Sequence, residues 1–531
     1  MNVKHNRFWI IRLLRLPATA EHKLSSFIHR IPPDIRFGCN FALLSVATAF
    51  LISHSQISRM PHWQQWFGLT FAVAGIYFAL YQAATRSKSL RLPFATTFWV
   101  AALAIFLQTA FTRVGYYLAE TLTHNQDLNG HLSTFGFELA IPFAACALVL
   151  SVLVGSQIAL VAALITSIFA AFISEAGVAI GVYSLIGSIA AIAGSERYRS
   201  RNAISIEVLV IGSVNAVMSL FMPFIAGQTP TLRGIFNGVL LGLLSGLQSA
   251  AIVSLIVPIF ESAFDILTDM KLLELSNADN PLLRDLAIKT PGTHHHSFIV
   301  ATLAESAAKA IGANDLLAKT ACLYHDIGKM AAPKMYIENQ NGMENPHNQV
   351  TAKDSVRIVT GHVRRGIKLG QEFGLPQQII DFIPQHHGTR ILAYFYHKAK
   401  SEAEERGETV DPGEFRYPGP KPQTKEAVIV MLADGAEAAV RSLHEHSIEN
   451  IRAIIKKIID HIVADGQFNE SDVTLQELDV IRESLINTLA SIHHQRVSYP
   501  GFNPSKDDKP DSDDDKDREP PLPSTLQAGV R

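Results

Sequence analysis

The stretch Tyr324-His325-Asp326-Ile327-Gly328-Lys329 closes an apolar segment, Leu316 to Tyr324, whose three-to-four spacing predicts a helix. It places an imidazole beside a carboxylate at a helix end. Such a pair can bind two metal ions, with the carboxylate bridging them and the imidazole on one side. A single His-Asp pair means little, because about one is expected by chance in a chain with 21 histidines. Its meaning depends on the other His and Asp residues of the chain.

Those residues lie on or at the ends of other predicted helices: His294-His295-His296, His362, His386-His387 and Asp434. Together with His325 and Asp326 they offer neutral imidazoles and carboxylates. This donor set suits Fe, Mn, Zn or Co rather than Ca or Mg. The sequence therefore predicts a transition-metal site, in preference to a set of unconnected polar residues.

The part of the chain that carries these residues has an ordinary soluble composition and an apolar spacing typical of helices. No alternating run bounded by hairpin turns stands out, so an all-helical domain is predicted over residues 261–503. Helices are expected near 271–275, 282–288, 298–311, 316–324, 355–373, 377–384, 425–443 and 448–464. Residues 407–422 are dense in Pro and Gly and predict a loop, and residues 504–531 predict a disordered acidic and Pro-rich tail.

The preceding part of the chain has a different composition. Only 15 of the 224 residues between Phe37 and Phe260 are charged, which excludes a purely soluble enzyme. The soluble second half excludes a pure transporter, and a net charge of -2 gives no reason to expect DNA or RNA as a partner. A multi-pass membrane domain is predicted over residues 37–260, with eight crossings near 37–55, 66–85, 94–117, 139–154, 157–174, 177–194, 204–226 and 235–259.

Charge also predicts the orientation. Residues 1–36 form a basic segment rich in Lys and Arg, which by the positive-inside bias lies in the cytoplasm. With eight crossings the basic segments 85–91 and 196–201 also fall inside, whereas 120–138, without Lys or Arg, falls outside. The same parity places everything after Phe260 in the cytoplasm. Three scattered cysteines are too few for a disulfide framework or a thiolate metal site.

The order His, His-Asp, His, His-His, Asp resembles the HD superfamily of metal-dependent phosphohydrolases. The chain is similar above all to the PgpH-like membrane HD hydrolases, also called seven-transmembrane HD proteins. Several short segments carry this resemblance in the family's order: Lys271 to Asn277, Pro291-Gly-Thr-His-His-His-Ser297, Tyr324 to Lys329, Glu338-Asn-Gln-Asn-Gly342 and Phe415-Arg-Tyr-Pro-Gly-Pro-Lys-Pro-Gln423. The resemblance extends from the first crossing to about Pro500 and implies a bacterial inner-membrane protein.

The resemblance implies two divalent transition-metal ions, Fe or Mn, bridged by Asp326. One would be held by His362, His386 and His387, and the other by His296, His325 and Asp434. Asp326 and Lys329 would act in catalysis, with Lys329 near the scissile phosphate. The implied reaction is hydrolysis of cyclic di-AMP to pApA by a hydroxide that the metals activate. Arg416 and Tyr417 could bind phosphate or stack on a base, or their loop could only pack on the domain.

Three alternatives remain open at this point. The same site could act on another cyclic dinucleotide or on a guanosine polyphosphate, because substrate choice rests on resemblance alone. The domain could also bind its ligand without turnover, as a membrane receptor. Besides the substrate, the partner expected is the lipid bilayer, and a homo-oligomer is possible.

The chain departs from the family pattern in three places. Family members normally carry a large extracytoplasmic domain after the first crossing, and here His54 to Gln65 occupy that place. His294 stands where a tyrosine is usual, and Asn348 where an aspartate is. His294 and His295 are expected to be loop or outer residues rather than ligands, and His347 a loop hydrogen-bonding residue. His493-His494 falls outside the ligand order.

Overall fold

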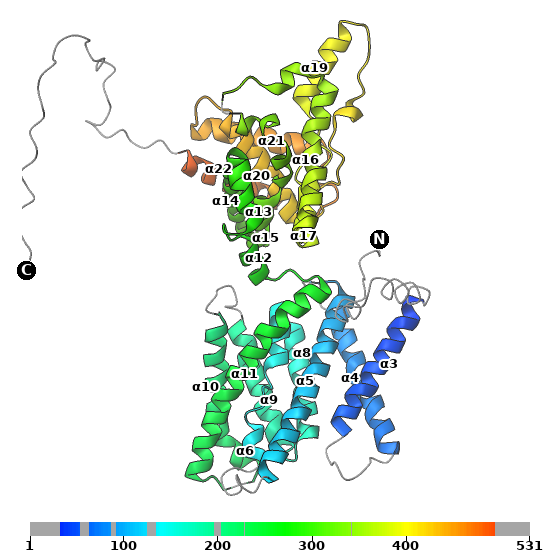
Figure 1. Cartoon of the computed structure of the whole chain (residues 1–531), viewed down its shortest axis with the longest axis vertical. Coiled ribbons are helices and arrows are strands. Elements are labelled where there is room, and N and C mark those ends of the chain that lie inside the picture. Colours follow the sequence, from blue (N-terminus) through cyan, green and yellow to red (C-terminus); the bar gives the residue numbers. More distant parts are fainter. Residues whose placement is uncertain are drawn as a thin grey trace, which may run out of the picture.

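A computed structural model describes residues 32–53, 63–86, 92–124, 134–195, 203–227, 229–340 and 342–493. Its described elements are helices, with a single isolated bridge between Ile391 and Arg416 and no strand among them. The all-helical prediction is therefore confirmed. Figure 1 shows two bodies, a bundle of long helices and a C-terminal domain of shorter ones. The basic segment 1–31, the loops 87–91 and 196–201 and the tail 504–531 lie outside the described residues.

Among the described residues, the bundle contains seven helices long and apolar enough to cross a membrane. They are α3 (Pro33–Ser53), α4 (Trp63–Arg86), α5 (Phe94–His124), α8 (Ser156–Ile173), α9 (Val178–Ser195), α10 (Ala203–Ile225) and α11 (Leu232–Phe264). Seven of the eight predicted crossings thus correspond to such helices. Large apolar side chains on their outer faces remain exposed, as expected where lipid replaces water.

The predicted crossing over residues 139–154 does not form a helix of that length. The chain instead forms the short helices α6 (Thr134–Glu138) and α7 (Ala145–Leu153), separated by a non-helical stretch. Almost every residue of α7 is buried, so this helix is covered by its neighbours rather than by lipid. Tertiary packing, which an apolar run does not reveal, allows this interruption.

Side chains from neighbouring helices satisfy the interrupted backbone. Ser245 donates to the carbonyl oxygen of Ile141 at 2.8 Å, and Gln108 donates to that of Pro142 at 3.2 Å. The same Gln108 accepts from the backbone N–H of Cys146 at 3.1 Å. Non-helical backbone at membrane depth requires such partners because lipid supplies none. The apolar crossing can therefore break without leaving these backbone groups unpaired.

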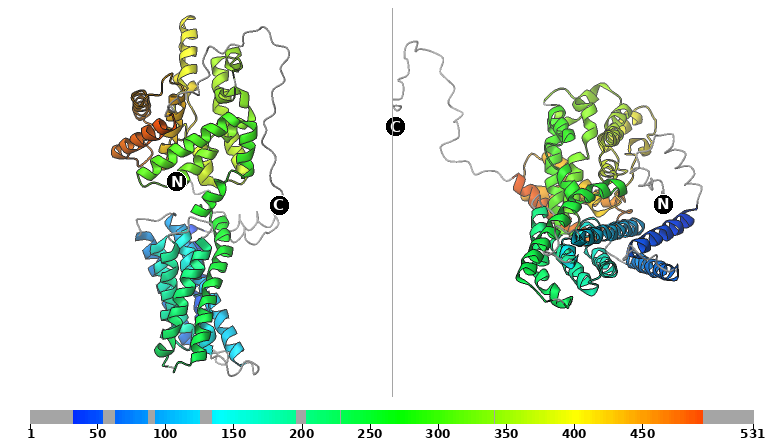
Figure 2. Two further views of the ribbon diagram at one scale, coloured as in Figure 1. Left: turned by 90° about the vertical axis from the view of Figure 1, so that its left-hand side faces the viewer. Right: turned by 60° about the horizontal axis from the view of Figure 1, so that its bottom comes forward.

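A short connection joins the bundle to the C-terminal domain (Figures 1 and 2). Helix α11 ends at Phe264, and Asp265, its C-cap residue, adopts a left-handed conformation with φ 56°. Thr268 caps helix α12 (Asp269–Leu275). Ile266 is buried in the bundle core and Leu267 packs on the core of the C-terminal domain. Gln378 also donates to the carbonyl oxygen of Asp265 at 2.8 Å.

Helix α20 (Lys425–Arg441) forms the centre of the C-terminal domain, with an unbroken buried run from Ala427 to Ala433. Around it lie α14 (Pro291–Ala310), α15 (Asp315–Tyr324), α18 (Phe382–Gln385), α21 (Ile448–Ala464) and α22 (Leu475–Ile492). The domain also contains α13 (Pro281–Lys289), α16 (Ala352–Glu372) and α17 (Gln377–Ile380). A further helix, α19 (Ala393–Glu404), was not predicted, and it lies at the outer end of the domain in Figure 1.

Two boundaries differ from the prediction in ways that affect the site. Helix α14 begins at Pro291 rather than Phe298, so the three consecutive histidines are helical. Proline suits the first turn of a helix because it has no N–H to leave unpaired. The segment 377–384 divides into α17 and α18. The chain after Asp326 forms a short 3-10 helix, η2 (Ile327–Ala331), packed against α16.

Gly328 makes this packing possible. A Cβ atom at Gly328 would lie 1.9 Å from the carbonyl oxygen of His362 and 2.6 Å from the nitrogen of Gly366. Both contacts are with rigid backbone, so Gly328→Ala is expected to separate η2 from α16 and lower the melting temperature by about 10 °C. Thermal unfolding of the full chain in detergent measures this effect.

Gly361→Ala is the matched control on α16, because its Cβ would meet only the flexible guanidinium of Arg365, at 3.0 Å or more. Equal melting temperatures for the two variants would contradict the expected backbone clash.

Candidate metal centre

The seven predicted ligands come from five separate parts of the C-terminal domain. His296 lies in the second turn of α14, His325 and Asp326 follow α15, His362 lies on α16, His386 and His387 follow α18, and Asp434 lies on α20. Two groups of their ligand atoms are close enough to hold a metal ion. One group is Asp326, His362, His386 and His387, and the other is His296, His325 and Asp326. The fold therefore brings together residues up to 138 positions apart.

Asp326 belongs to both groups, and each of its oxygens faces one of them. Its Oδ1 lies 3.4 Å from Nε2 of His362 and 3.7 Å from Nε2 of His386. Its Oδ2 lies 3.2 Å from Nε2 of His325 and 3.8 Å from Nε2 of His296. This is the arrangement that a bridging carboxylate requires.

Backbone carbonyls orient three of the imidazoles. Nδ1 of His325 lies 2.6 Å from the carbonyl oxygen of Cys322, and Nδ1 of His362 lies 2.6 Å from that of Val359. His386 makes a longer contact of the same kind with Phe382, at 3.3 Å. A carbonyl oxygen only accepts, so Nδ1 carries the proton in each ring and Nε2 keeps its lone pair.

Several buried polar atoms of these residues have no hydrogen-bond partner. Among the described residues, the buried polar atoms without a hydrogen-bond partner include Nε2 of His325, His362 and His386 and Oδ1 of Asp326. Buried polar groups are normally paired, because an unpaired one costs about 1–3 kcal/mol. Four orphaned acceptor atoms that converge on one site fit a metal centre.

Burial keeps this donor set ready to bind metal. It lowers the pKa of His362 to about 4 and that of His386 to about 3, so both rings are neutral at physiological pH. Burial also raises the pKa of Asp326, but Lys329 and His325 outweigh it and hold that pKa well below its usual range. His362 and His386 therefore present neutral imidazoles beside an ionised carboxylate.

Asp434 lies at the edge of the second group. Its Oδ1 lies 3.1 Å from Nε2 of His296 and 3.9 Å from Nε2 of His325, and its Oδ2 lies 3.9 Å from Nδ1 of His387. Burial raises its pKa, but the hydrogen bond and charge of His296 outweigh this and keep the pKa well below its usual range. Asp434 is therefore an anion between the two groups, and its assignment to one metal stays a prediction.

Sequence reasoning missed Glu437. Its Oε2 lies 2.6 Å from Nδ1 of His296, and its Oε1 accepts from Arg441 at 3.1 Å. Burial lowers the pKa of His296, but hydrogen bonds to Asp434 and Glu437 outweigh it and raise the pKa to about 9. A metal bound at Nε2 would replace a proton, so uptake there improves as pH rises. The available signal was the three-residue spacing of Asp434 and Glu437, which places them on one helix face.

Glu437→Gln is expected to weaken metal binding by about 10- to 100-fold, because the carboxylate orients His296 and increases its basicity. Competition between the full chain and a chelator of known affinity measures this change.

Glu449→Gln, at an exposed position on α21, is the matched control and should keep the wild-type affinity. Unchanged affinity in Glu437→Gln would show that Glu437 does not support the metal centre.

Lys329 lies directly beside the bridging carboxylate. Its Nζ lies 2.6 Å from Oδ2 of Asp326 and donates to Oε1 of Glu338 at 2.9 Å. Burial lowers the pKa of Lys329, but these two carboxylates outweigh it and raise the pKa above its ordinary value. The ammonium group is therefore charged. Glu338 was quoted only as part of a similar segment, and its contact with Lys329 was not predicted.

The two residues of the Pro-Gly loop have different surroundings. Arg416 forms a two-pronged ion pair with Asp465, at 2.9 and 3.1 Å, and donates to the carbonyl oxygen of Thr389 at 2.7 Å. Its guanidinium is thus engaged in holding the loop. Tyr417 stacks on the ring of His387, with centroids 4.0 Å apart. Contact of either residue with substrate stays a prediction, and Tyr417 is the one at the metal-ligand cluster.

The remaining histidines lie outside both groups. His295 is exposed and His294 half-buried, both in the first turns of α14 and not in a loop. His347 lies 3.0 Å from the carbonyl oxygen of Met335, so its predicted hydrogen bond is confirmed, although the residue belongs to a short 3-10 helix, η5 (Pro346–Gln349), and not to a loop. His493 stacks on His446, and His494 lies outside the described residues.

Comparison with known proteins agrees with this geometry. Residues 63–268 match the family described as "7TM receptor with intracellular HD hydrolase", and residues 293–439 match the HD domain. The fold and site thus define an HD domain joined to a multi-pass membrane domain. The chain belongs to the membrane HD-domain proteins, and the resemblance stated from sequence is confirmed.

Among its relatives are two proteins named cyclic-di-AMP phosphodiesterase PgpH. The chain is 40% identical to that of Bacillus subtilis over 368 residues, and 38% identical to that of Listeria monocytogenes over 364 residues. Each match covers 68% of this chain, and the chain spans about half the length of these relatives, 51% and 50%. A solved structure of the L. monocytogenes PgpH HD domain in complex with cyclic-di-AMP is 47% identical to the matching part of this chain. The match covers 41% of this chain and 100% of the solved chain, with a TM-score of 0.39.

Proposed function

We propose that the chain is an integral membrane phosphodiesterase that hydrolyses cyclic di-AMP to pApA. The observation that supports this proposal most directly is the position of Asp326. Its two carboxylate oxygens face two separate groups of imidazoles, and the ammonium group of Lys329 contacts one of these oxygens, Oδ2. Relatives named as cyclic-di-AMP phosphodiesterases support the choice of substrate. The positive charge of residues 1–36 favours a cytoplasmic N-terminus, and an even number of crossings, in which the interrupted run 139–154 is the eighth, would place the HD domain in the cytoplasm as well.

The ligand residues would hold two divalent transition-metal ions, Fe or Mn. When bound, such ions supply Lewis acidity toward a phosphate group and toward an attacking water. Asp326 would hold the two groups of ligands at a fixed position relative to each other, since its carboxylate faces both. Glu437 would orient His296, and the carbonyls of Cys322 and Val359 would orient His325 and His362.

Lys329 would act on the substrate directly. Its charged ammonium group lies beside the ligand cluster and is held by Glu338 from behind. In that position it can donate to a non-bridging phosphate oxygen, on which negative charge grows as the phosphodiester is cleaved. The face of Tyr417, stacked on His387, would border the same space.

The test is turnover by the full chain in detergent, loaded anaerobically with Fe(II) or Mn(II), beside a His325→Ala/Asp326→Ala double variant. Cyclic di-AMP, cyclic di-GMP and guanosine tetraphosphate are supplied separately, and products are identified by mass spectrometry. Conversion of cyclic di-AMP to pApA, lost in the double variant, supports the proposal. A preference for another compound would overturn the substrate, and metal binding without any turnover would favour a ligand-binding receptor.

A further inference from the structure

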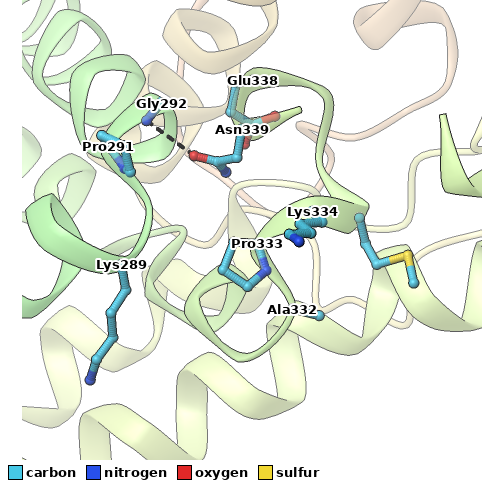
Figure 3. Close-up of a pocket in the computed structure, with 9 residues that line it drawn as sticks. Lys289, Pro291, Gly292, Ala332, Pro333, Lys334, Glu338 and Asn339 are labelled. Atoms are coloured by element: carbon cyan, nitrogen blue, oxygen red, sulfur yellow. Dashed lines mark hydrogen bonds between the residues drawn. The ribbon is translucent and has the colours of Figure 1, made fainter. Parts of the chain in front are cut away.

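Side-chain amides from distant segments hold the backbone beside two of the ligand-bearing segments. Figure 3 shows the first, at the edge of a pocket, where Oδ1 of Asn339 accepts from the N–H of Gly292 at 3.0 Å. This contact fixes the start of α14, the helix that carries His296. The second amide belongs to Gln467, in the turn between α21 and α22, and it meets the backbone that follows His387.

His387 is the candidate ligand whose ring is held least directly. Each of the other four imidazoles has a hydrogen bond to a carbonyl or carboxylate oxygen, whereas none to the ring of His387 is found among the described residues. The carboxylate of Asp434 lies 3.9 Å from its Nδ1, beyond hydrogen-bond distance. The ring instead stacks on Tyr417. Its position therefore depends on the backbone turn that follows it and on the loop that carries Tyr417.

Gln467 is fully buried and holds this turn. Its Oε1 accepts from the N–H of Thr389, two residues after His387, at 3.0 Å. Gly388 lies between these two residues with φ 53°, and a Cβ atom there would clash with the same oxygen. The amide of Gln467 thus fits closely against the turn, in the space that the glycine leaves open.

The orientation of this amide follows from its two partners. The backbone N–H of Thr389 only donates, so it meets Oε1, and the carboxylate of Asp465 accepts from Nε2 at 2.7 Å. Burial raises the pKa of Asp465, but Arg416 and Gln467 outweigh it and hold that pKa below its usual range. Asp465 is therefore an anion, and an exchange of the amide oxygen and nitrogen would remove both hydrogen bonds.

A closed ring of hydrogen bonds joins the turn to the loop of Tyr417. Arg416 pairs with Asp465 at 2.9 and 3.1 Å, and it donates to the carbonyl oxygen of Thr389 at 2.7 Å. Gln467 completes the ring, because it contacts both Asp465 and Thr389. One network therefore holds both the turn after the ligand and the loop that stacks on the ligand.

We infer that Gln467 is a positioning residue of the metal centre, which sets His387 against Tyr417 through the turn at Thr389. The inference rests on the metal centre of the proposed function, and it adds a residue outside the matched HD domain, residues 293–439. A ligand that is already in place needs less ordering when a metal binds. The ligand group that contains His387 therefore depends on Gln467, and the other group does not.

The test is Mn(II) binding by the full chain in detergent, with the free ion measured by electron paramagnetic resonance. Gln467→Glu keeps the size of the side chain and the acceptor for Thr389, but it places a carboxylate oxygen 2.7 Å from Asp465. One of the two binding steps is expected to weaken about tenfold, while the other keeps the wild-type affinity. Gln476→Glu, at an exposed position on α22, is the matched control and should bind as the wild type does.

Two further variants separate positioning from stability. Gln467→Met removes the hydrogen bonds without adding charge, and it should weaken the same step by a smaller factor. Ile455→Val, in the buried core of α21, should lower the melting temperature and leave both steps unchanged.

Wild-type binding in both Gln467 variants, equal weakening of both steps, or an equal loss in Ile455→Val would overturn the inference. Failure of the proposed function is distinct, because the wild-type chain would then bind two Mn(II) ions without hydrolysing cyclic di-AMP.

Discussion

Replacing Asp326 with alanine is expected to abolish phosphodiester hydrolysis, lowering turnover by at least about a thousandfold. Asp326 is the residue common to both groups of potential metal ligands, with one oxygen toward each. Removing it takes a negatively charged ligand from two sites at once. Metal content, measured on the purified full chain by mass spectrometry, should therefore fall together with turnover.

The fold must be monitored at the same time, because the variant also leaves Lys329 with one carboxylate partner fewer. Asp460→Ala, at an exposed position on α21, is the matched control and should keep both turnover and metal content. An Asp326→Ala chain that retained wild-type turnover and metal content would show that Asp326 is not a bridging ligand.

Lys329→Met is expected to lower kcat by about 10²- to 10³-fold while the metal content stays at the wild-type value. The ammonium group is charged, lies 2.6 Å from Asp326 and is not itself a metal ligand. Its loss would remove the donor that we propose for the developing phosphate charge, and it leaves Glu338 buried without its cation. The melting temperature should therefore also fall.

A double variant separates these two effects. Glu338→Gln in the Lys329→Met background removes the unpaired carboxylate charge, so thermal stability should recover while turnover stays low. Glu338→Gln alone should reduce turnover less than Lys329→Met, because the ammonium group remains. If turnover recovered together with stability in the double variant, Lys329 would have only a structural role.

The candidate ligands that sequence reasoning proposed share one property. His325-Asp326, His386-His387 and Asp434 are chemically specific residue types in a recognisable order. The residues it missed are common ones that act through contacts between distant segments. Glu338 meets Lys329 nine positions away, and Glu437 meets His296 across 141 positions. Neither contact can be read from the order of residues along the chain, although the three-residue spacing of Asp434 and Glu437 places those two on one helix face.

Arg416 illustrates the same limit. The sequence offered a cation in a loop near the site, with phosphate binding and loop packing equally open. The structure shows the guanidinium held by Asp465 and by a backbone carbonyl. A sequence shows that a residue is positively charged but not where its side chain points. Which anion the side chain pairs with is decided by tertiary packing.

The sequence by itself determined the division into a membrane bundle and a soluble helical domain, because composition and periodicity follow from the solvent that each helix faces. It also identified the candidate ligands, since few residue types bind transition metals. Only the tertiary structure decided that the apolar run 139–154 breaks around α7, because partners for its backbone come from distant helices. It likewise decided that each oxygen of Asp326 faces a different group of histidines, because that geometry depends on how five separate segments pack together.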